Sequence, residues 1–102
     1  MPLTMMAVIK TKPGRVDEIL DGLRVILPDT RDFDGCTRLD VVQDADDPTT
    51  ITLIEEWEGR DHFAAYRAWR AESGTGLARW ADALAEPPTI TAYEQRRDIY
   101  WG

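Results

Sequence analysis

The sequence has one cysteine, one histidine and no asparagine among its 102 residues. A single thiol, Cys36, excludes an intramolecular disulfide and is consistent with a reducing compartment. One imidazole, that of His62, and one thiol are too few for a zinc or iron site, so no metal is expected. No apolar run reaches membrane-spanning length, and residues 1–4 lack the basic start of a secretory signal. A cytoplasmic protein is therefore predicted.

Positive charge is scarce as well. The formal net charge is −7 and the isoelectric point is near 4.6. Nucleic acids and anionic membrane surfaces both require a basic face, so neither is expected as a partner. The length predicts one domain, covering residues 1–102. A hydrophobic content of 43% with four tryptophans predicts a packed core.

The segment 49–59 carries the strongest strand signal, because β-branched and apolar residues dominate it between a turn at 46–48 and Gly59. Both of its alternating residue sets contain apolar side chains, which is typical of a strand covered on both faces. Glu55 and Glu56 have opposite parity, so at most one of them faces a helix layer. A surface position at the strand end is the alternative for both.

Periodicity predicts the remaining elements. Further strands are expected at residues 5–11, 36–43 and 89–95, and helices at 16–27, 61–73 and 77–84. Pro28 should bend or end the first helix, with at most one loose turn over residues 29–33. Arg38 and Asp40 share the side of their strand that faces away from the helices, where they could form a structural ion pair.

The order β-α-β-β-α-(α)-β predicts an α+β, ferredoxin-like fold, with an antiparallel sheet and helices on one face. The strands are apolar on both sides, so a second copy of the sheet should cover the other face. We therefore expect a homodimer in the form of a dimeric α/β barrel. Residues 95–102 form a C-terminal tail, predicted to be an arm on the partner subunit, with a frayed end as the alternative.

Several short segments occur in an order that resembles the antibiotic biosynthesis monooxygenase (ABM) family. They are Lys12-Pro13-Gly14-Arg15, Asp34-Gly35-Cys36-Thr37-Arg38-Leu39-Asp40-Val41, Asp44-Ala45-Asp46-Asp47-Pro48, Glu55-Glu56-Trp57 and Pro87-Pro88-Thr89-Ile90. The resemblance implies a dimeric barrel with one pocket per subunit, between helices and sheet. Members often oxidise quinol-like or polyketide-like aromatic substrates with dioxygen, without metal or flavin. Relatives degrade haem or isomerise small sugar phosphates.

The haem-degrading relatives use an asparagine on the first strand and a histidine in the second-helix region. Residues 5–11 contain no asparagine here, and residues 77–81 contain no histidine, which disfavours that activity. The absence of asparagine also removes the oxyanion donor that some family mechanisms use. Trp57, Tyr66 or a backbone N–H would have to replace it.

Oxygenation without a cofactor needs a proton acceptor, an oxyanion donor and an apolar, water-poor pocket. The candidate catalytic residues are Trp57, His62 and Tyr66. Trp57 matches the family's Glu-Glu-Trp position, whose tryptophan lines the pocket in relatives; a core role is the alternative. His62 is the one imidazole available as a base, although a histidine at a helix start is usually solvated.

The candidate substrate-binding residues are Glu55, Phe63, Trp69 and Trp80. Phe63 and Trp69 fall on one stripe of the second helix with Tyr66, and such a stripe is also typical of a core. Arg67 and Arg70 are expected to point outward from that helix. Cys36 is interpreted as structural, because no base lies near it in sequence.

Three functions remain open. The first is a small monooxygenase that takes dioxygen and an aromatic phenol, quinol or anthrone. The second is a dimeric module that binds a small hydrophobic ligand without turnover, which the single histidine and missing asparagine favour. The third is an isomerase or decarboxylase for a small anion, which needs arginine or histidine in the pocket.

Overall fold

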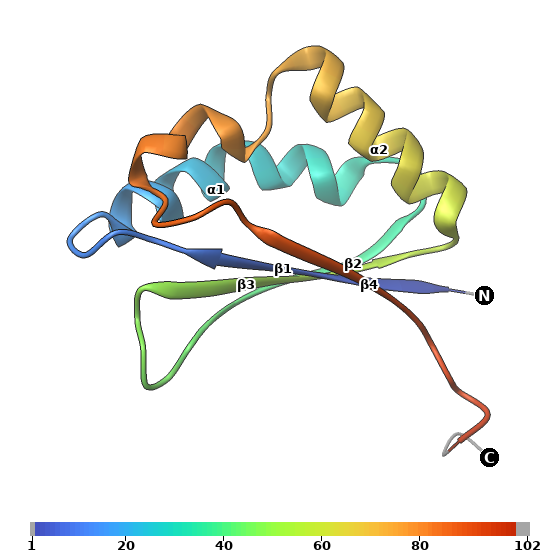
Figure 1. The fold of residues 1–102 in the computed structure, drawn as a ribbon. Coiled ribbons are helices and arrows are strands. Elements are labelled where there is room, and N and C mark those ends of the chain that lie inside the picture. The colour runs from blue at the N-terminus through green and yellow to red at the C-terminus, as the bar shows by residue number, and fades with distance from the viewer. Residues whose placement is uncertain (1, 100–102) are drawn as a thin grey trace.

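The computed structural model describes residues 2–99 as a four-stranded sheet with its helices on one face (Figure 1). The α+β, ferredoxin-like prediction is confirmed. The elements are β1 (Leu3–Lys10), α1 (Val16–Asp32), β2 (Cys36–Gln43), β3 (Thr50–Trp57), α2 (Arg60–Ser73), the 3-10 helix η1 (Leu77–Ala83) and β4 (Thr89–Glu94). No helix within residues 2–99 is long and apolar enough to cross a membrane.

The sheet has the strand order β2-β3-β1-β4, and every neighbouring pair is antiparallel. Strand β3 lies inside the sheet, between β1 and β2, as its two apolar faces predict. Its helix-facing side chains are all buried, whereas those of the opposite set are half-buried. The buried set is Ile51, Leu53, Glu55 and Trp57.

Helix α1 supplies most of the core on the helix side through Ile19, Leu23, Ile26 and Leu27, whose spacing follows the helical period. Pro28 does not end this helix, which continues to Asp32; the further turn allowed after Pro28 is present and helical. Proline removes one backbone hydrogen bond. The last turn is retained because contacts from α2 hold the buried Thr30.

Helices α2 and η1 complete the layer. Phe63 is the buried residue of α2, and Trp80 interrupts the helical backbone of η1. Trp80 packs on α1, where a Cβ at Gly22 would lie 2.8 Å from its ring. This close approach requires glycine at position 22 and anchors η1 to α1.

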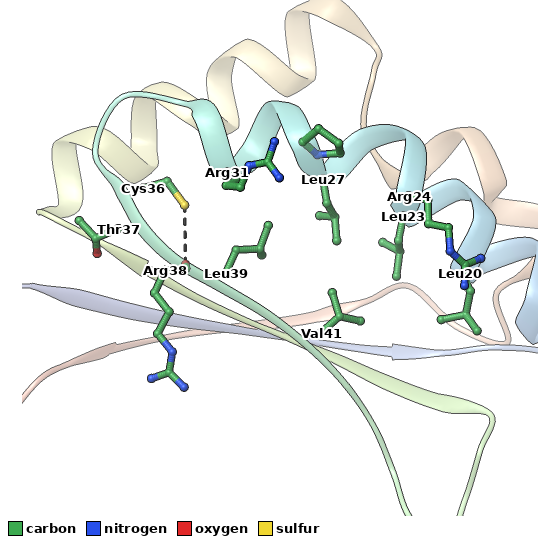
Figure 2. A pocket seen from close by; sticks show the side chains of 11 residues that line it. Leu20, Leu23, Arg24, Leu27, Arg31, Cys36, Thr37, Arg38, Leu39 and Val41 are labelled. Atoms are coloured by element: carbon green, nitrogen blue, oxygen red, sulfur yellow. Dashed lines mark hydrogen bonds between the residues drawn. The ribbon is translucent and has the colours of Figure 1, made fainter.

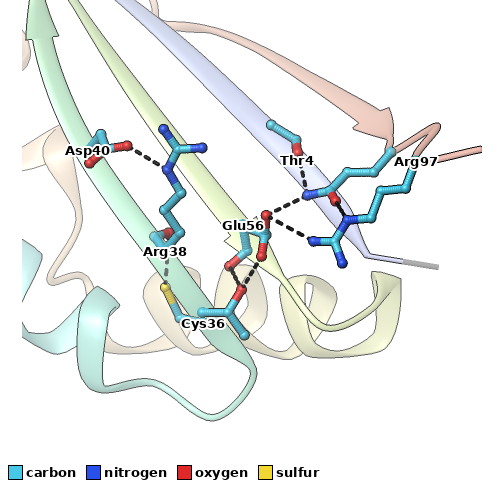
Figure 3. Close-up of polar contacts among 8 residues, drawn as sticks. Thr4, Cys36, Arg38, Asp40, Glu56 and Arg97 are labelled. Carbon is cyan, nitrogen blue, oxygen red and sulfur yellow. Dashed lines mark hydrogen bonds and ion pairs between the residues drawn. The ribbon is translucent and has the colours of Figure 1, made fainter. Parts of the chain in front are cut away.

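The other sheet face has no helix over it (Figure 1). Its half-buried or exposed apolar residues are Met6, Val8, Val42, Ile54 and Tyr93. Arg38 and Asp40 form the predicted ion pair on this face, with Nε and Oδ2 2.6 Å apart (Figure 3). The predicted arm includes Tyr100, Trp101 and Gly102, which lie outside the described residues.

A substitution at Gly35 tests how tightly the turn before β2 is packed. Its φ is +93°, and a Cβ there would run into the ring of His62. We expect Gly35→Ala to lower the free energy of unfolding by roughly 2–3 kcal/mol, because backbone strain and overpacking add. Urea unfolding followed by tryptophan fluorescence measures the loss.

Gly14 is the matched control, since its φ is +78° but a Cβ would meet nothing within 4 Å. Gly14→Ala should therefore cost only about 1 kcal/mol, from backbone strain alone. Equal losses in the two variants would show that the His62 contact does not constrain the turn.

Candidate functional site

The main cavity lies between the sheet and the helix layer and has a volume of about 460 Å³. This size is within the range of pockets that hold small organic ligands. Most of its walls are apolar. The apolar walls include Met5, Ala7 and Leu53 from the sheet, Leu23 and Ile26 from α1, and Leu77 from η1.

Glu55 is the carboxyl group of this cavity. It projects from β3 toward the helices and is only 2% exposed, whereas Glu56 lies on the opposite face. The indole Nε1–H of Trp57 donates a hydrogen bond of 3.0 Å to Glu55 Oε1. Burial raises the pKa of Glu55 to about 7, although the Trp57 hydrogen bond and the charge of Arg70 oppose the rise. The carboxyl can therefore exchange a proton near neutral pH.

Glu56 occupies a different environment, on the open sheet face (Figure 3). It accepts hydrogen bonds from Gln95 Nε2 and from the hydroxyl of Thr37. These bonds hold its pKa below the ordinary value, so it stays ionised. Glu56 has a structural role at the tail and is no candidate for proton transfer.

Arg70 forms a polar clamp across the helix layer. Its Nε donates to the Tyr66 hydroxyl at 2.9 Å, its Nη2 to the Ile26 carbonyl at 2.7 Å and to Thr30 Oγ1 at 2.8 Å, and its Nη1 to the Thr75 carbonyl at 3.1 Å. The prediction that Arg70 points outward is wrong. These hydrogen bonds join α2 to α1 and to the turn after α2. They offset the unfavourable free energy of removing the guanidinium from water.

Tyr66 lines the cavity with its ring, but its hydroxyl points into the clamp. The hydroxyl lies 2.7 Å from Thr30 Oγ1 and also accepts the bond from Arg70. With both contacts in place, the phenol is positioned as a wall of the cavity.

The predicted aromatic residues cluster around Tyr66. Its ring centroid lies 5.0 Å from that of Trp57 and 6.3 Å from that of Trp69. Phe63 lies 5.8 Å from Trp57 and lines the cavity. Phe33 joins the cluster at 5.4 Å from Tyr66 and was missed, since a lone aromatic after a helix carries no periodic signal. Trp57 and Trp69 belong to the cluster but not to the residues that line the cavity.

His62 and Trp80 lie elsewhere. His62 packs over Gly35, with Nε2 3.8 Å from Glu58 Oε2 and 3.9 Å from Asp34 Oδ2, and it lines a separate surface hollow with Leu3. Trp80 packs on α1, as described above. The structure therefore gathers Glu55, Trp57, Phe63 and Tyr66 around the cavity, but does not bring His62 or Trp80 to it.

A second groove, of about 610 Å³, lies between α1 and β2 (Figure 2). Leucines and Val41 form its interior, and its arginines each pair with a nearby aspartate, as Arg24 does with Asp21. Cys36 sits at one end, where burial and the charge of Glu55 raise the pKa of its thiol. The groove offers no group that transfers a proton near neutral pH, so the main cavity is the better candidate site.

The raised pKa of Glu55 predicts a pH-dependent stability. The folded protein holds this proton with a pKa of about 7 against an ordinary value of 4.5. Stability should therefore fall as pH rises through this window, by roughly 2 kcal/mol between pH 5 and pH 8. In Glu55→Gln this contribution disappears, so urea unfolding at the two pH values should show a smaller difference than in the wild type.

Glu56→Gln is the control for that comparison. Its carboxyl has a lowered pKa in the folded state, so its contribution to stability is present above its ordinary pKa and is lost in acid. Removing it should leave the loss between pH 5 and pH 8 in place. A full pH dependence in Glu55→Gln would show that a group other than Glu55 takes up this proton.

Comparison with known proteins agrees with the fold. The profile of the family described as "Antibiotic biosynthesis monooxygenase" matches residues 2–72. No protein of curated function matches the chain significantly.

Solved structures show the same architecture. A conserved protein from Methanosarcina mazei Go1 has a TM-score of 0.84 at 19% identity, with 94% of each chain covered. Rv0793 from Mycobacterium tuberculosis has a TM-score of 0.82 at 21% identity, with 94% of this chain and 96% of that chain covered. A crystal structure of an antibiotic biosynthesis monooxygenase has a TM-score of 0.79 at 25% identity, with 92% of this chain and 98% of that chain covered. The chain belongs to the antibiotic biosynthesis monooxygenase family.

Proposed function

We propose that the protein is a cofactor-independent monooxygenase that oxidises a flat, electron-rich aromatic substrate of the quinol or anthrone class with dioxygen. The observation that carries this proposal is the buried carboxyl of Glu55, whose pKa is about 7, in a mostly apolar cavity of about 460 Å³. Family membership supports the reaction type, and the cavity supports the kind of substrate.

Glu55 acts as the general base in this proposal. A quinol or anthrone reduces dioxygen readily only after it has lost a proton, and a base with a pKa near the working pH is best placed to remove it. The other Glu55 oxygen has no hydrogen bond from any described residue, which leaves it available to a substrate hydroxyl. The Trp57 indole fixes the carboxyl through Oε1.

The electrons come from the substrate itself. With an anthrone, the methylene carbon gives up two C–H bonds and gains a C=O bond. One oxygen atom of dioxygen enters that carbonyl, and the other leaves as water with both hydrogens. The proton that Glu55 takes first returns to the peroxide anion that forms when dioxygen adds to the carbanion, which gives the carbon-bound hydroperoxide. Glu55 then removes the second C–H proton as the O–O bond breaks, and that proton leaves with the departing hydroxide as water. The apolar walls keep bulk water from the carbanion before dioxygen arrives.

The aromatic residues have supporting roles. Phe63 and Tyr66 form walls against which a flat ring can stack, and Trp69 supports them from behind. The Tyr66 hydroxyl is occupied by Thr30 and Arg70, so it is assigned no proton transfer. His62 and Trp80 are given no role in the reaction.

Dioxygen consumption tests the function directly. The metal-stripped protein should consume dioxygen in the presence of anthrones or quinols and form one oxygenated product per dioxygen. Glu55→Gln should lower the rate by about 100-fold, the effect typical of a lost general base. Glu56→Gln, on the other sheet face, should retain the wild-type rate. Wild-type turnover in Glu55→Gln would remove Glu55 from the mechanism.

A second candidate is an isomerase or decarboxylase acting on a small anion, because two arginines, Arg67 and Arg70, line the cavity together with Glu55. The two functions differ in their need for dioxygen. Product formation from an anionic substrate under argon would favour this candidate. Ligand-induced stabilisation without any turnover would instead point to a binding module.

We also propose that the protein is a homodimer through the open sheet face. This proposal is supported by apolar residues on that face, where Val42 is 45% exposed and Tyr93 50% exposed. Apolar area of this kind is favourable to bury against a second copy.

A charge at the centre of the open face tests the dimer. The wild type should have a mass near twice the 11.6 kDa of one chain in light scattering after size exclusion. Ile54→Arg should give the monomer mass, because each copy would have to bury a guanidinium group where the wild type buries an apolar side chain. Val25→Arg, a change on the outer side of α1 where Val25 is 61% exposed, should remain dimeric. A dimeric Ile54→Arg variant would place the interface elsewhere.

A further inference from the structure

Arg67 is the charged residue at the mouth of the main cavity. The ionisable side chains that line the cavity, apart from the Tyr66 phenol, are Glu55, Arg67 and Arg70. Glu55 is almost completely buried at the sheet, whereas Arg67 is exposed on α2. Arg67 is therefore a charged lining residue that a ligand in the cavity can contact from the solvent side.

The guanidinium of Arg67 has no polar partner in the part of the chain that the structure describes. No residue of the described range 2–99 forms a hydrogen bond or ion pair with it, and its contact is with the Phe63 ring, 5.8 Å from the centroid. Arg70, one turn further on, has its donors occupied by the clamp. The two arginines of this cavity thus differ in role: one supports the structure and the other is available to a ligand.

This free guanidinium stands out in an acidic chain. Most arginines of the described residues pair with nearby carboxylates, as Arg15 does with Glu18 and Arg60 with Glu94. Arg79, whose contact is also with an aromatic ring, lies outside the cavity lining. Around Arg67 the neighbours one turn away are Phe63, Ala64, Arg70 and Ala71, which offer no negative charge. Two guanidinium groups at positions i and i+3 of one helix repel each other, and a bound anion would relieve that repulsion.

We propose that Arg67 is a specificity-determining residue that binds a carboxylate carried by the substrate, while the aromatic hydroxyl at the substrate's other end reaches Glu55. The planar guanidinium can donate two parallel hydrogen bonds to a carboxylate. Phe63 lies beneath Arg67 and next to Trp57, and it forms an aromatic wall of the cavity. The aromatic ring of the substrate stacks on this wall, with its carboxylate at Arg67 and its hydroxyl at Glu55. The preferred substrates are aromatic hydroxy acids with the carboxylate remote from the hydroxyl. The orientation toward Glu55 rests on the proposed function, whereas the carboxylate contact does not.

Calorimetric titration under argon tests this site without turnover. The probes are 6-hydroxy-2-naphthoic acid and its methyl ester, which differ in the charge at one end. Wild-type protein should bind the acid about three- to tenfold more tightly than the ester, as expected for a partly exposed charge-assisted contact. In Arg67→Gln this preference should vanish while the ester binds as before. Arg67→Lys should keep part of it, and 1 M salt should weaken it in the wild type.

Arg79→Gln is the matched control. Arg79 is also an arginine stacked on an aromatic ring, with its Cζ 4.9 Å from the Trp80 centroid, but it does not line the cavity. This variant should keep the wild-type preference for the acid. Equal affinities of the wild type for acid and ester, no binding of the acid, or an unchanged preference in Arg67→Gln would each overturn the proposal.

The titration and the dioxygen assay together separate this inference from the proposed oxygenase. If the carboxylate preference depends on Arg67 but no hydroxy acid supports dioxygen consumption, the proposed reaction fails and the ligand class stands. If anthrones and quinols are oxidised but the preference is absent, the reaction stands and the role of Arg67 is overturned.

Discussion

Strand β3 has apolar side chains on both faces, and one layer of helices can bury only one of them. The sheet order places β3 inside, between β1 and β2, and the helices cover the face that carries Ile51, Leu53 and Trp57. Everything else about the domain follows from this division. The covered face contains the core and the main cavity, and the open face is left with apolar area that a second copy can bury.

On the covered face, Glu55 is the residue whose burial is unfavourable. The Glu55 carboxyl lies among apolar residues on the buried side of β3 and loses its contact with water. The hydrogen bond from the Trp57 indole and the charge of Arg70 offset only part of this loss. The carboxyl of Glu55 therefore keeps its proton to a higher pH than it would in solution. A polar group that weakens the fold above neutral pH is thus the same group that can remove a proton inside an apolar cavity.

The two arginines of α2 that line the cavity have different partners. Arg70 shares a helix face with Tyr66 and meets acceptors from α1, so its charge becomes part of the structure. Arg67 lies closer to solvent and covers the Phe63 ring, and its guanidinium has no hydrogen bond to any residue in 2–99. Three positions, less than one helical turn, separate an arginine bonded into the structure from one without a polar partner among the described residues. The reason is that the two side chains leave the helix in directions where different elements are in reach.

Periodicity along the sequence determined the elements, their order and the ferredoxin-like fold, since side-chain spacing and turn residues are local properties. It also determined that Glu55 and Glu56 point to opposite faces. Only the tertiary structure decided which of the two meets the helices, that Arg70 turns inward, that α1 continues past Pro28, and that His62 stays away from the cavity. The pattern of a strand or helix defines the relative directions of its own side chains. Whether one of those directions is buried depends on elements far away in the sequence, which local patterns do not contain.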